Sequence, residues 1–312
     1  MTNIIKIDIF PDLEFPCSTS KLKVNKNRFT TDLIVTGNYP PEYKIFNLDE
    51  CYNFLERKLD SNVIDFTFIQ NKKLIFLRED KIIEIFHKFN SFYKIKISNY
   101  GKQIERFSDS VYFSTRFDVQ KLNFENGQIT TVYESEFEIN HFTISQNHGI
   151  MAISTGKSAI SEKKTENDHE NQNNSGALVF LDTRTDDVIK KIFPDQEIIC
   201  SEYDENISIG YATSDSFNVL DLRSDRPNII KQYSGIKQIK RHQKEWFIID
   251  QANNFSHIDS KGEIDSFNCT EPITSFDMLD GIAFCSLENG RILSFKTDDK
   301  ILPGWCTLHD AE

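Results

Sequence analysis

The stretch Lys73-Leu74-Ile75-Phe76-Leu77 is a short apolar run, and a second apolar run closes soon after it at Phe86-His87. Runs of β-branched and aromatic residues separated by polar turns are typical of short strands, and helical periodicity is nearly absent from this chain. The ending of the second run, an apolar residue followed by a polar one, recurs along the sequence. It is found at Phe46-Asn47, Phe86-His87, Leu122-Asn123, Leu181-Asp182, Leu220-Asp221, Ile258-Asp259 and Phe295-Lys296.

The spacing of these endings is nearly constant. Successive endings lie 40, 36, 59, 39, 38 and 37 residues apart, and the long interval falls to 39 when a polar insert of 20 residues, 156–175, is removed. A single four-stranded sheet of this size cannot bury both faces, so repeats of about 40 residues must stack around an axis. The sequence therefore predicts an all-β, seven-bladed WD40-like β-propeller.

The domain boundaries follow from the same repeat. We expect the propeller to occupy residues 1–302 and a C-terminal tail to occupy residues 303–312. Ring closure commonly joins strands from both ends of the chain, and residues 4–10 are the candidate closing strand, with residues 18–24 as the alternative. The insert at 156–175 has almost no apolar side chains, which predicts a mobile loop between two strands of the fourth blade.

Composition excludes several classes of protein. The 312 residues carry a formal charge of −12, which is incompatible with a nucleic-acid-binding surface over the whole molecule but compatible with a local basic patch. Hydrophobic residues make up 38%, enough for a buried core. No apolar run approaches the roughly 20 residues that span a bilayer. The six cysteines are scattered and the chain starts with a strand pattern, so we expect an intracellular protein.

The search for chemistry is largely negative. The sequence has no G-x-S-x-G, phosphate-binding glycine loop or H-E-x-x-H motif, and its histidines lack metal-ligand spacing with cysteine. Asp182, Asp221 and Asp259 follow the ends of equivalent strands, where turn geometry explains them better than acid–base catalysis. We therefore predict no catalytic residue, no cofactor and no metal.

Two arginines are candidates for contact with a partner. Asp221-Leu222-Arg223, with Arg226 close behind it, repeats the pattern of Asp182-Thr183-Arg184 one blade earlier. These guanidinium groups are suited to bind a phosphate or an acidic partner. The alternative, which we favour, is an intramolecular pair with the neighbouring aspartates.

A basic segment supplies the second group of candidates. It contains Lys237, Lys240, Arg241 and Lys244, with His242 and Trp246 beside them. Cationic groups next to an aromatic ring favour contact with single-stranded RNA. Because alternation along a strand splits these side chains between two faces, we favour a solvated edge, and keep Lys240 and Arg241 as candidate interaction residues.

Six segments of the chain, taken in order, carry a resemblance to one family. They are 37–41 (GNYPP), 52–61 (YNFLERKLDS), 91–101 (SFYK…NYG), 111–127 (VYF…LNFENG), 221–227 (DLRSDRP) and 303–306 (PGWC). These segments resemble motifs of the nucleolar protein 10 family, called essential nuclear protein 2 in yeast. Trp305, in the motif that leaves the propeller, is a further candidate interaction residue.

The resemblance implies a function. It implies a non-catalytic scaffold of the small-subunit processome, which assembles on pre-rRNA around the U3 small nucleolar RNA and supports 18S rRNA maturation. The implied location is the nucleolus, inside the nucleus. The implied partners are other processome proteins, with pre-rRNA and U3 RNA in the same particle, in direct or indirect contact. A WD-repeat adaptor outside ribosome assembly, for example in ubiquitin ligation or vesicle trafficking, is the alternative, and a propeller enzyme is the third hypothesis.

Overall fold

A computed structural model of the chain describes residues 5–7, 18–26, 30–49, 52–69, 73–87, 90–124, 126–156, 176–194, 196–204, 207–224, 227–242, 245–258 and 264–296. Within these ranges the regular structure consists of strands. No helix occurs among them, and hence none that is long and apolar enough to cross a membrane. The all-β prediction is confirmed.

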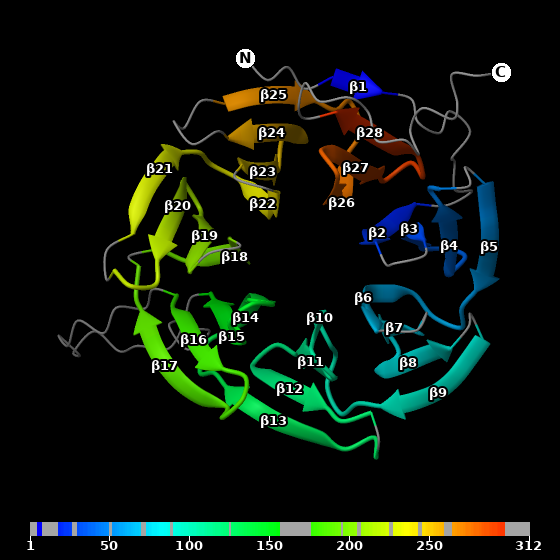
Figure 1. Cartoon of the computed structure of the whole chain (residues 1–312), viewed down its shortest axis with the longest axis horizontal. Helices are drawn as coiled ribbons and strands as arrows, with labels where there is room; N and C mark the ends of the chain where they lie inside the picture. The colour runs from blue at the N-terminus through cyan, green and yellow to red at the C-terminus, as the bar shows by residue number, and fades with distance from the viewer. Residues whose placement is uncertain are drawn as a thin grey trace, which may run out of the picture.

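The strands form seven antiparallel sheets of four, arranged as blades around a central axis (Figure 1). Blades 1 to 4 comprise β2 (Thr19–Lys26), β3 (Thr31–Gly37), β4 (Glu42–Asn47) and β5 (Tyr52–Lys58); β6 (Val63–Ile69), β7 (Lys73–Arg78), β8 (Ile82–His87) and β9 (Asn90–Lys96); β10 (Gln103–Phe107), β11 (Ser110–Ser114), β12 (Asp118–Leu122) and β13 (Ile129–Glu134); and β14 (Ile139–Ile144), β15 (Ile150–Thr155), β16 (Leu178–Asp182) and β17 (Asp187–Ile192).

The remaining blades complete the ring. Blades 5 to 7 comprise β18 (Ile198–Tyr203), β19 (Ser208–Thr213), β20 (Ser216–Asp221) and β21 (Asn228–Gln232); β22 (Ile236–His242), β23 (Glu245–Asp250), β24 (Asn254–Ile258) and β25 (Ile264–Asn268); and β26 (Ile273–Leu279), β27 (Ile282–Leu287), β28 (Ile292–Lys296) and β1 (Ile5–Ile7). The seven-bladed propeller predicted from the sequence is therefore confirmed.

The repeated sequence endings mark the same place in every blade. The third strand of each blade stops there, as β4 does at Asn47, β8 at His87 and β28 at Lys296. The spacing predicted the blades because the apolar third strand is buried between its neighbours, whereas the turn after it faces solvent. The polar insert does fall between the second and third strands of the fourth blade, β15 and β16. Residues 157–175 of the insert and the predicted tail at 303–312 lie outside the described residues.

The ring is closed by the N-terminal strand. β1 pairs antiparallel with β28, with Ile5 opposite Lys296 and Ile7 opposite Ser294. This confirms residues 4–10 as the site of the closing strand. The alternative, residues 18–24, lies instead in β2, the innermost strand of blade 1. Blade 7 thus joins both ends of the chain, as Figure 1 shows at the top of the ring.

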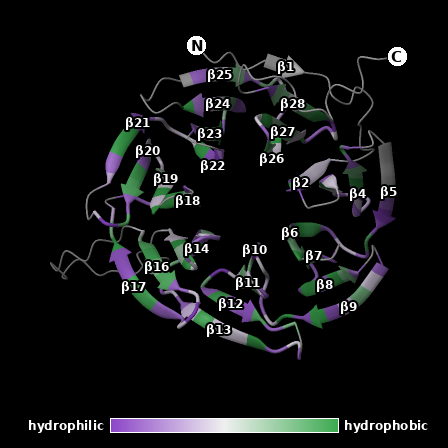
Figure 2. Ribbon diagram, in the orientation of Figure 1, coloured by the Kyte–Doolittle hydropathy of each residue, from purple (hydrophilic) through white to green (hydrophobic). Residues whose placement is uncertain are grey.

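The hydrophobic core is divided among the blade interfaces. Seven clusters of buried side chains are present in the described residues, and each contains residues of two neighbouring blades. Phenylalanine fills many of these contacts, and Phe66, Phe142 and Phe276 are fully buried. Figure 2 shows hydrophobic residues along inner strands such as β7 and hydrophilic ones on parts of outer strands such as β17. No blade has a closed core of its own, so each is stabilised by its neighbours.

Candidate functional site: the polar central channel

The innermost strands of all seven blades surround the axis of the ring (Figure 1), and residues of all seven line a central channel. The channel contains a cavity of about 240 Å³. Ammonium groups of Lys21, Lys23 and Lys240 face it, together with the carboxylates of Asp65 and Asp277. Because side chains two residues apart on a strand share a face, each innermost strand presents two positions to this channel.

These two channel positions recur once per blade. The first is held by Lys21, Asp65, Gln103, His141, Cys200, Gln238 and Ser275, which all line the channel. The second is held by Lys23, Glu105, Glu202, Lys240 and Asp277, which line it too, and by Thr67 and Thr143 at the equivalent places of β6 and β14. In six blades the register of the innermost strand shifts by one residue just before the first position. A bulge of this kind turns the following side chain, so the shift sets which residues face the channel.

Polar side chains at the first position bind the backbone of the next blade. Asp65 Oδ2 accepts the amide N–H of Ile104 at 2.9 Å, which joins blade 2 to blade 3. Gln103 Nε2 donates to the carbonyl oxygen of Phe142 at 2.7 Å, and its Oε1 accepts the Phe142 N–H at 3.0 Å. Each bond satisfies a main-chain group on the inner edge of a sheet, which would otherwise lack a strand partner.

The same arrangement continues at two other joints. Gln238 Nε2 donates to the carbonyl oxygen of Phe276 at 3.2 Å, between blades 6 and 7. Between blades 7 and 1 the bond comes from the second channel position, where Asp277 Oδ2 accepts the amide N–H of Val24 at 2.9 Å. Polar groups of the channel therefore hold the blades to one another around the axis.

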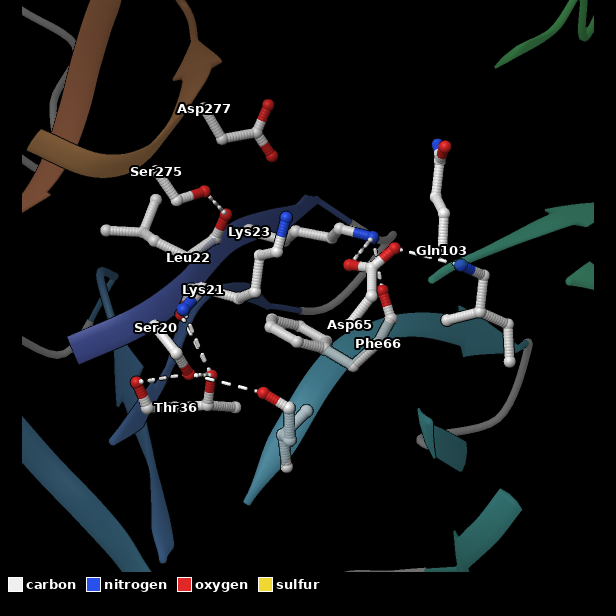
Figure 3. Close-up of polar contacts among 12 residues, drawn as sticks. Ser20, Lys21, Leu22, Lys23, Thr36, Asp65, Phe66, Gln103, Ser275 and Asp277 are labelled. Atoms are coloured by element: carbon white, nitrogen blue, oxygen red, sulfur yellow. Dashed lines mark hydrogen bonds and ion pairs between the residues drawn. The ribbon is translucent and has the colours of Figure 1, made fainter. Parts of the chain in front are cut away.

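Blades 1 and 2 are joined by an ion pair (Figure 3). Lys23 Nζ lies 2.9 Å from Asp65 Oδ1 and also donates to the carbonyl oxygen of Phe66. Burial by itself would raise the pKa of Asp65, but the charges of Lys23 and Lys21 and the bond from the Ile104 N–H outweigh it. The pKa of Asp65 is therefore held below its ordinary value, and the carboxylate stays ionised.

Two other groups of the channel are shifted toward their neutral forms. Burial raises the pKa of Glu105 to about 8, and the charge of Glu202 adds to the rise. Burial lowers the pKa of His141 to about 3, and the positive charges of Lys240 and Lys21 lower it further. At neutral pH the imidazole of His141 is therefore uncharged, and the carboxyl of Glu105 is mostly protonated.

These groups offer little chemistry. Burial raises the pKa of the Cys200 thiol, so the thiolate needed for nucleophilic attack is not formed at neutral pH. In the described part of the chain, no group of three His, Cys, Asp or Glu side chains could hold a metal ion. Most of the polar lining is engaged in joints between blades, and the channel is best understood as a structural seam.

The structure places Arg223 on the turn after β20. Its Nη2 lies 2.7 Å from Asp221 Oδ2, and Arg184 pairs with Asp182 at 2.6 Å in the equivalent turn of blade 4. Hydrogen bonds from these arginines lower the pKa of each aspartate to about 2. The predicted intramolecular pairing is confirmed for both arginines. A role of Arg223 in binding a partner stays a prediction.

Lys240 and Arg241 point to different surroundings, as alternation along β22 predicts. Lys240 faces the channel, where its Nζ lies 3.7 Å from Glu202 Oε2, and the charge of Glu202 raises the pKa of Lys240 despite burial. Arg241 lies over the ring of Trp246 at 4.6 Å and 3.6 Å from Asp204. The predicted split of the basic segment between two faces is confirmed, but the expectation of a solvated edge was wrong for Lys240 and Arg241: β22 is the inner edge of blade 6, where both side chains are largely buried.

Two further candidates, Arg226 and Trp305, lie outside the described residues. Sequence reasoning missed the seam formed by Asp65, Gln103 and Asp277. A signal was present, because Asp65, Gln103 and His141 recur at intervals of 38 residues. It could be read only after the innermost strand of each blade was known.

The comparisons with known proteins agree with this architecture. The family described as "Nucleolar protein 10-like, N-terminal domain" matches residues 3–295, which include all seven blades. Nucleolar protein 10 of Xenopus laevis is 24% identical over 86% of this chain, and Ribosome biogenesis protein ENP2 of Saccharomyces cerevisiae is 21% identical over 91%. The chain spans 39% and 38% of the lengths of these relatives.

A solved structure shows the same fold. The crystal structure of the computationally designed Ika8 protein superposes with a TM-score of 0.65, covering 91% of this chain and 97% of that one at 9% identity. At that identity the likeness concerns the fold alone. The family match, in contrast, extends over nearly the entire sequence and all the blades. The chain therefore belongs to the nucleolar protein 10-like family of N-terminal β-propeller domains.

Proposed function

We propose that this chain is a non-catalytic scaffold in ribosome biogenesis that works in the nucleolus. The observation that carries the proposal is the family match over residues 3–295, together with a relative named Ribosome biogenesis protein ENP2. The finer role is that of a component of the small-subunit processome that supports pre-rRNA processing and 18S rRNA maturation. Its partners are other processome proteins, with pre-rRNA and U3 RNA in the same particle.

The geometry supports a scaffold in two ways. The seam of the channel and the seven interface clusters tie every blade to its neighbours, so surface loops are presented in a fixed arrangement. The channel groups are paired, buried or neutral, as described for Asp65, Cys200 and His141. A rigid ring with many edges and no activated nucleophile in its channel suits the simultaneous binding of several proteins.

The formal charge of −12 favours protein partners over extensive direct contact with RNA. Contact with pre-rRNA is therefore the secondary part of the proposal. It would be restricted to local basic sites.

Affinity purification of the tagged protein, with sequencing of the bound RNA, tests the proposal. We expect enrichment of U3 RNA and 5′ pre-rRNA, and depletion of the protein should lower 18S rRNA while the large-subunit rRNA is spared. Recovery of neither RNA, with normal 18S levels after depletion and exclusion from the nucleolus, would reject the processome role. That result would favour an adaptor for other protein complexes.

A further inference from the structure

An apolar groove lies between blades 2 and 3 and extends from the end of β6 to β9. Its cavity has a volume of about 380 Å³ and is lined by Ile69, Ile85, Phe92, Tyr93 and Phe124, with Lys73 as its charged member. Phe92 is 72% exposed and Tyr93 is 49% exposed, unusually high values for aromatic side chains on a strand. Exposed aromatic surface beside a cavity marks an interaction site more often than a scattered apolar residue does.

The far wall of the groove is shaped by a glycine. Gly127, in the turn between β12 and β13, has φ = +70°, and a Cβ added to it would lie 3.2 Å from the Tyr93 hydroxyl oxygen. The ring of Tyr93 therefore lies close against a backbone that only glycine allows without strain. The turn is closed by the Gly127 N–H, which donates to the carbonyl oxygen of Asn123 at 2.9 Å. The wall is preformed, which lowers the cost of binding.

One side of the groove is an open strand edge. β9 pairs with β8 alone among the described strands, so its outer N–H and C=O groups have no strand partner. The sequence of β9, Asn-Ser-Phe-Tyr-Lys-Ile-Lys, contains two lysines and no acidic residue, and all but one of its residues are exposed. Such an edge can accept an extended peptide as an additional strand.

Charge indicates which peptide would fit. Lys73 lies in the groove and Lys96 at the end of β9, and the described residues place no carboxylate within 4 Å of either ammonium group. Lys94, on the same strand as Lys96, is already paired with Asp60 at 2.6 Å. An incoming segment paired along β9 would complement Lys73 with a carboxylate beside its apolar side chain, and Lys96 with a carboxylate farther along the strand.

We propose that β9 and this groove bind an extended acidic–apolar segment of a partner protein, which adds to the outer edge of β9 and inserts one apolar side chain against Phe92 and Tyr93. The inference rests on the proposed scaffold function, because the occupant would be one of the scaffold's partners. Single-stranded RNA also stacks on aromatic rings near lysines. The aliphatic walls of Ile69 and Ile85 favour a peptide, because an apolar side chain packs against them whereas a stacked base needs an aromatic face.

The test is selection of random twelve-residue peptides displayed on phage against the purified full chain. Peptides retained by the Phe92→Ser variant are removed by counter-selection. We expect a consensus with an apolar residue flanked by Asp or Glu. In fluorescence polarisation, Phe92→Ser should raise the Kd of the consensus peptide at least tenfold, about 1.4 kcal/mol. The matched control is Ile229→Ser, an equally simple loss of an exposed apolar side chain, 63% exposed, on β21; it should leave the Kd within twofold.

Two more measurements define the binding mode. N-methylation of alternate peptide bonds in the consensus peptide should abolish binding, because it removes the donors that pair with the edge of β9. Lys73→Glu should weaken binding of the acidic consensus peptide. A neutral version of the peptide should bind the wild type and Lys73→Glu with the same affinity. Circular dichroism of each variant confirms that the ring is folded. The proposal is overturned if no Phe92-dependent peptide emerges, or if the consensus lacks acidic residues. Phe92-dependent binding of oligouridylate RNA in place of peptide would overturn it as well.

The two proposals fail separately. Loss of Phe92-dependent peptide binding would remove the groove from the list of contact sites, while enrichment of U3 RNA on the wild-type protein would still support the processome role. Phe92-dependent peptide binding without any recovery of U3 RNA would support the groove as a contact site and count against the processome role.

Discussion

Arg78, at the end of β7, has the lowest solvent exposure of the buried charged residues in the described part of the protein. Its side chain is 1% exposed; Nη1 donates to Glu84, which is 3% exposed, and Nη2 lies 2.6 Å from Asp80 Oδ2. Glu84 also accepts a bond from the Ser91 hydroxyl at 2.6 Å and lies 3.4 Å from Lys94 Nζ. We predict that Arg78→Met strongly destabilises the protein because it leaves the Glu84 carboxylate buried without its main partner.

The magnitude follows from these contacts. Removing one member of a buried ion pair costs about 3 to 5 kcal/mol, and the remaining bonds from Ser91 and Lys94 place the expected loss at about 3 kcal/mol. An unfolding entropy of about 2.1 cal/mol/K per residue gives about 0.65 kcal/mol/K for the 312 residues. The melting temperature should therefore fall by about 5 °C. Arg78→Met combined with Glu84→Leu removes both charges and should recover most of the loss, to within about 1 kcal/mol of the wild type.

The assay is unfolding by heat and by urea of the purified wild type, the single variants and the double variant. Arg116→Met is the control, because Arg116 is 62% exposed and pairs with Glu138 at 3.2 Å; its loss should cost under about 1 kcal/mol. The reasoning fails if Arg78→Met costs no more than this control. It also fails if the double variant is as unstable as Arg78→Met alone, since the unpaired carboxylate would then not be the cause.

Three further perturbations test the seam, the packing and the titration of the channel. Gln103→Ala removes both bonds to Phe142, so the Phe142 amide should exchange its hydrogen at least tenfold faster, and unchanged exchange would refute the joint. Gly210→Ala would place a Cβ 2.6 Å from the ring of Trp246 in the next blade. We expect the free energy of unfolding to fall by about 1 to 3 kcal/mol and the tryptophan fluorescence to shift to the red. A melting temperature equal to that of the wild type would argue against this close contact. The pKa of Glu105 is raised from 4.5 to about 8, so its protonated form stabilises the fold fully below pH 4.5 and this contribution is lost as the pH rises through 8. The free energy of unfolding of Glu105→Gln should therefore rise relative to that of the wild type between pH 5 and 9, by more than about 1.4 kcal/mol, the equivalent of one pKa unit. If urea unfolding gives the same difference between the two proteins across that range, the carboxyl titrates normally.

The groove between blades 2 and 3 could be predicted from the sequence only in part. The segments that contain Phe92 and Gly127 stood out as motifs of the family, yet nothing along the chain indicated that they face one another. Arg223 was correctly interpreted, because a turn that places Asp221 two residues before an arginine pairs them locally, whatever the rest of the fold does. Local geometry can be predicted from neighbouring residues. A contact between two blades cannot.

The number of blades and the positions of the third strands were determined by the sequence alone, whereas the choice of closing strand between residues 4–10 and 18–24 was decided by the pairing of β1 with β28. Burial imposes a period on apolar residues, and that period can be counted without knowing where the chain goes. Only the tertiary structure decided that Asp65, Gln103 and Asp277 form one seam, and that Tyr93 lies against Gly127. The physical reason is that these contacts join neighbouring blades, so they depend on how the blades pack around the axis. One-residue register shifts just before Asp65 and before Ser275 add to this, because they reorient the side chains that follow without changing the hydrophobic pattern.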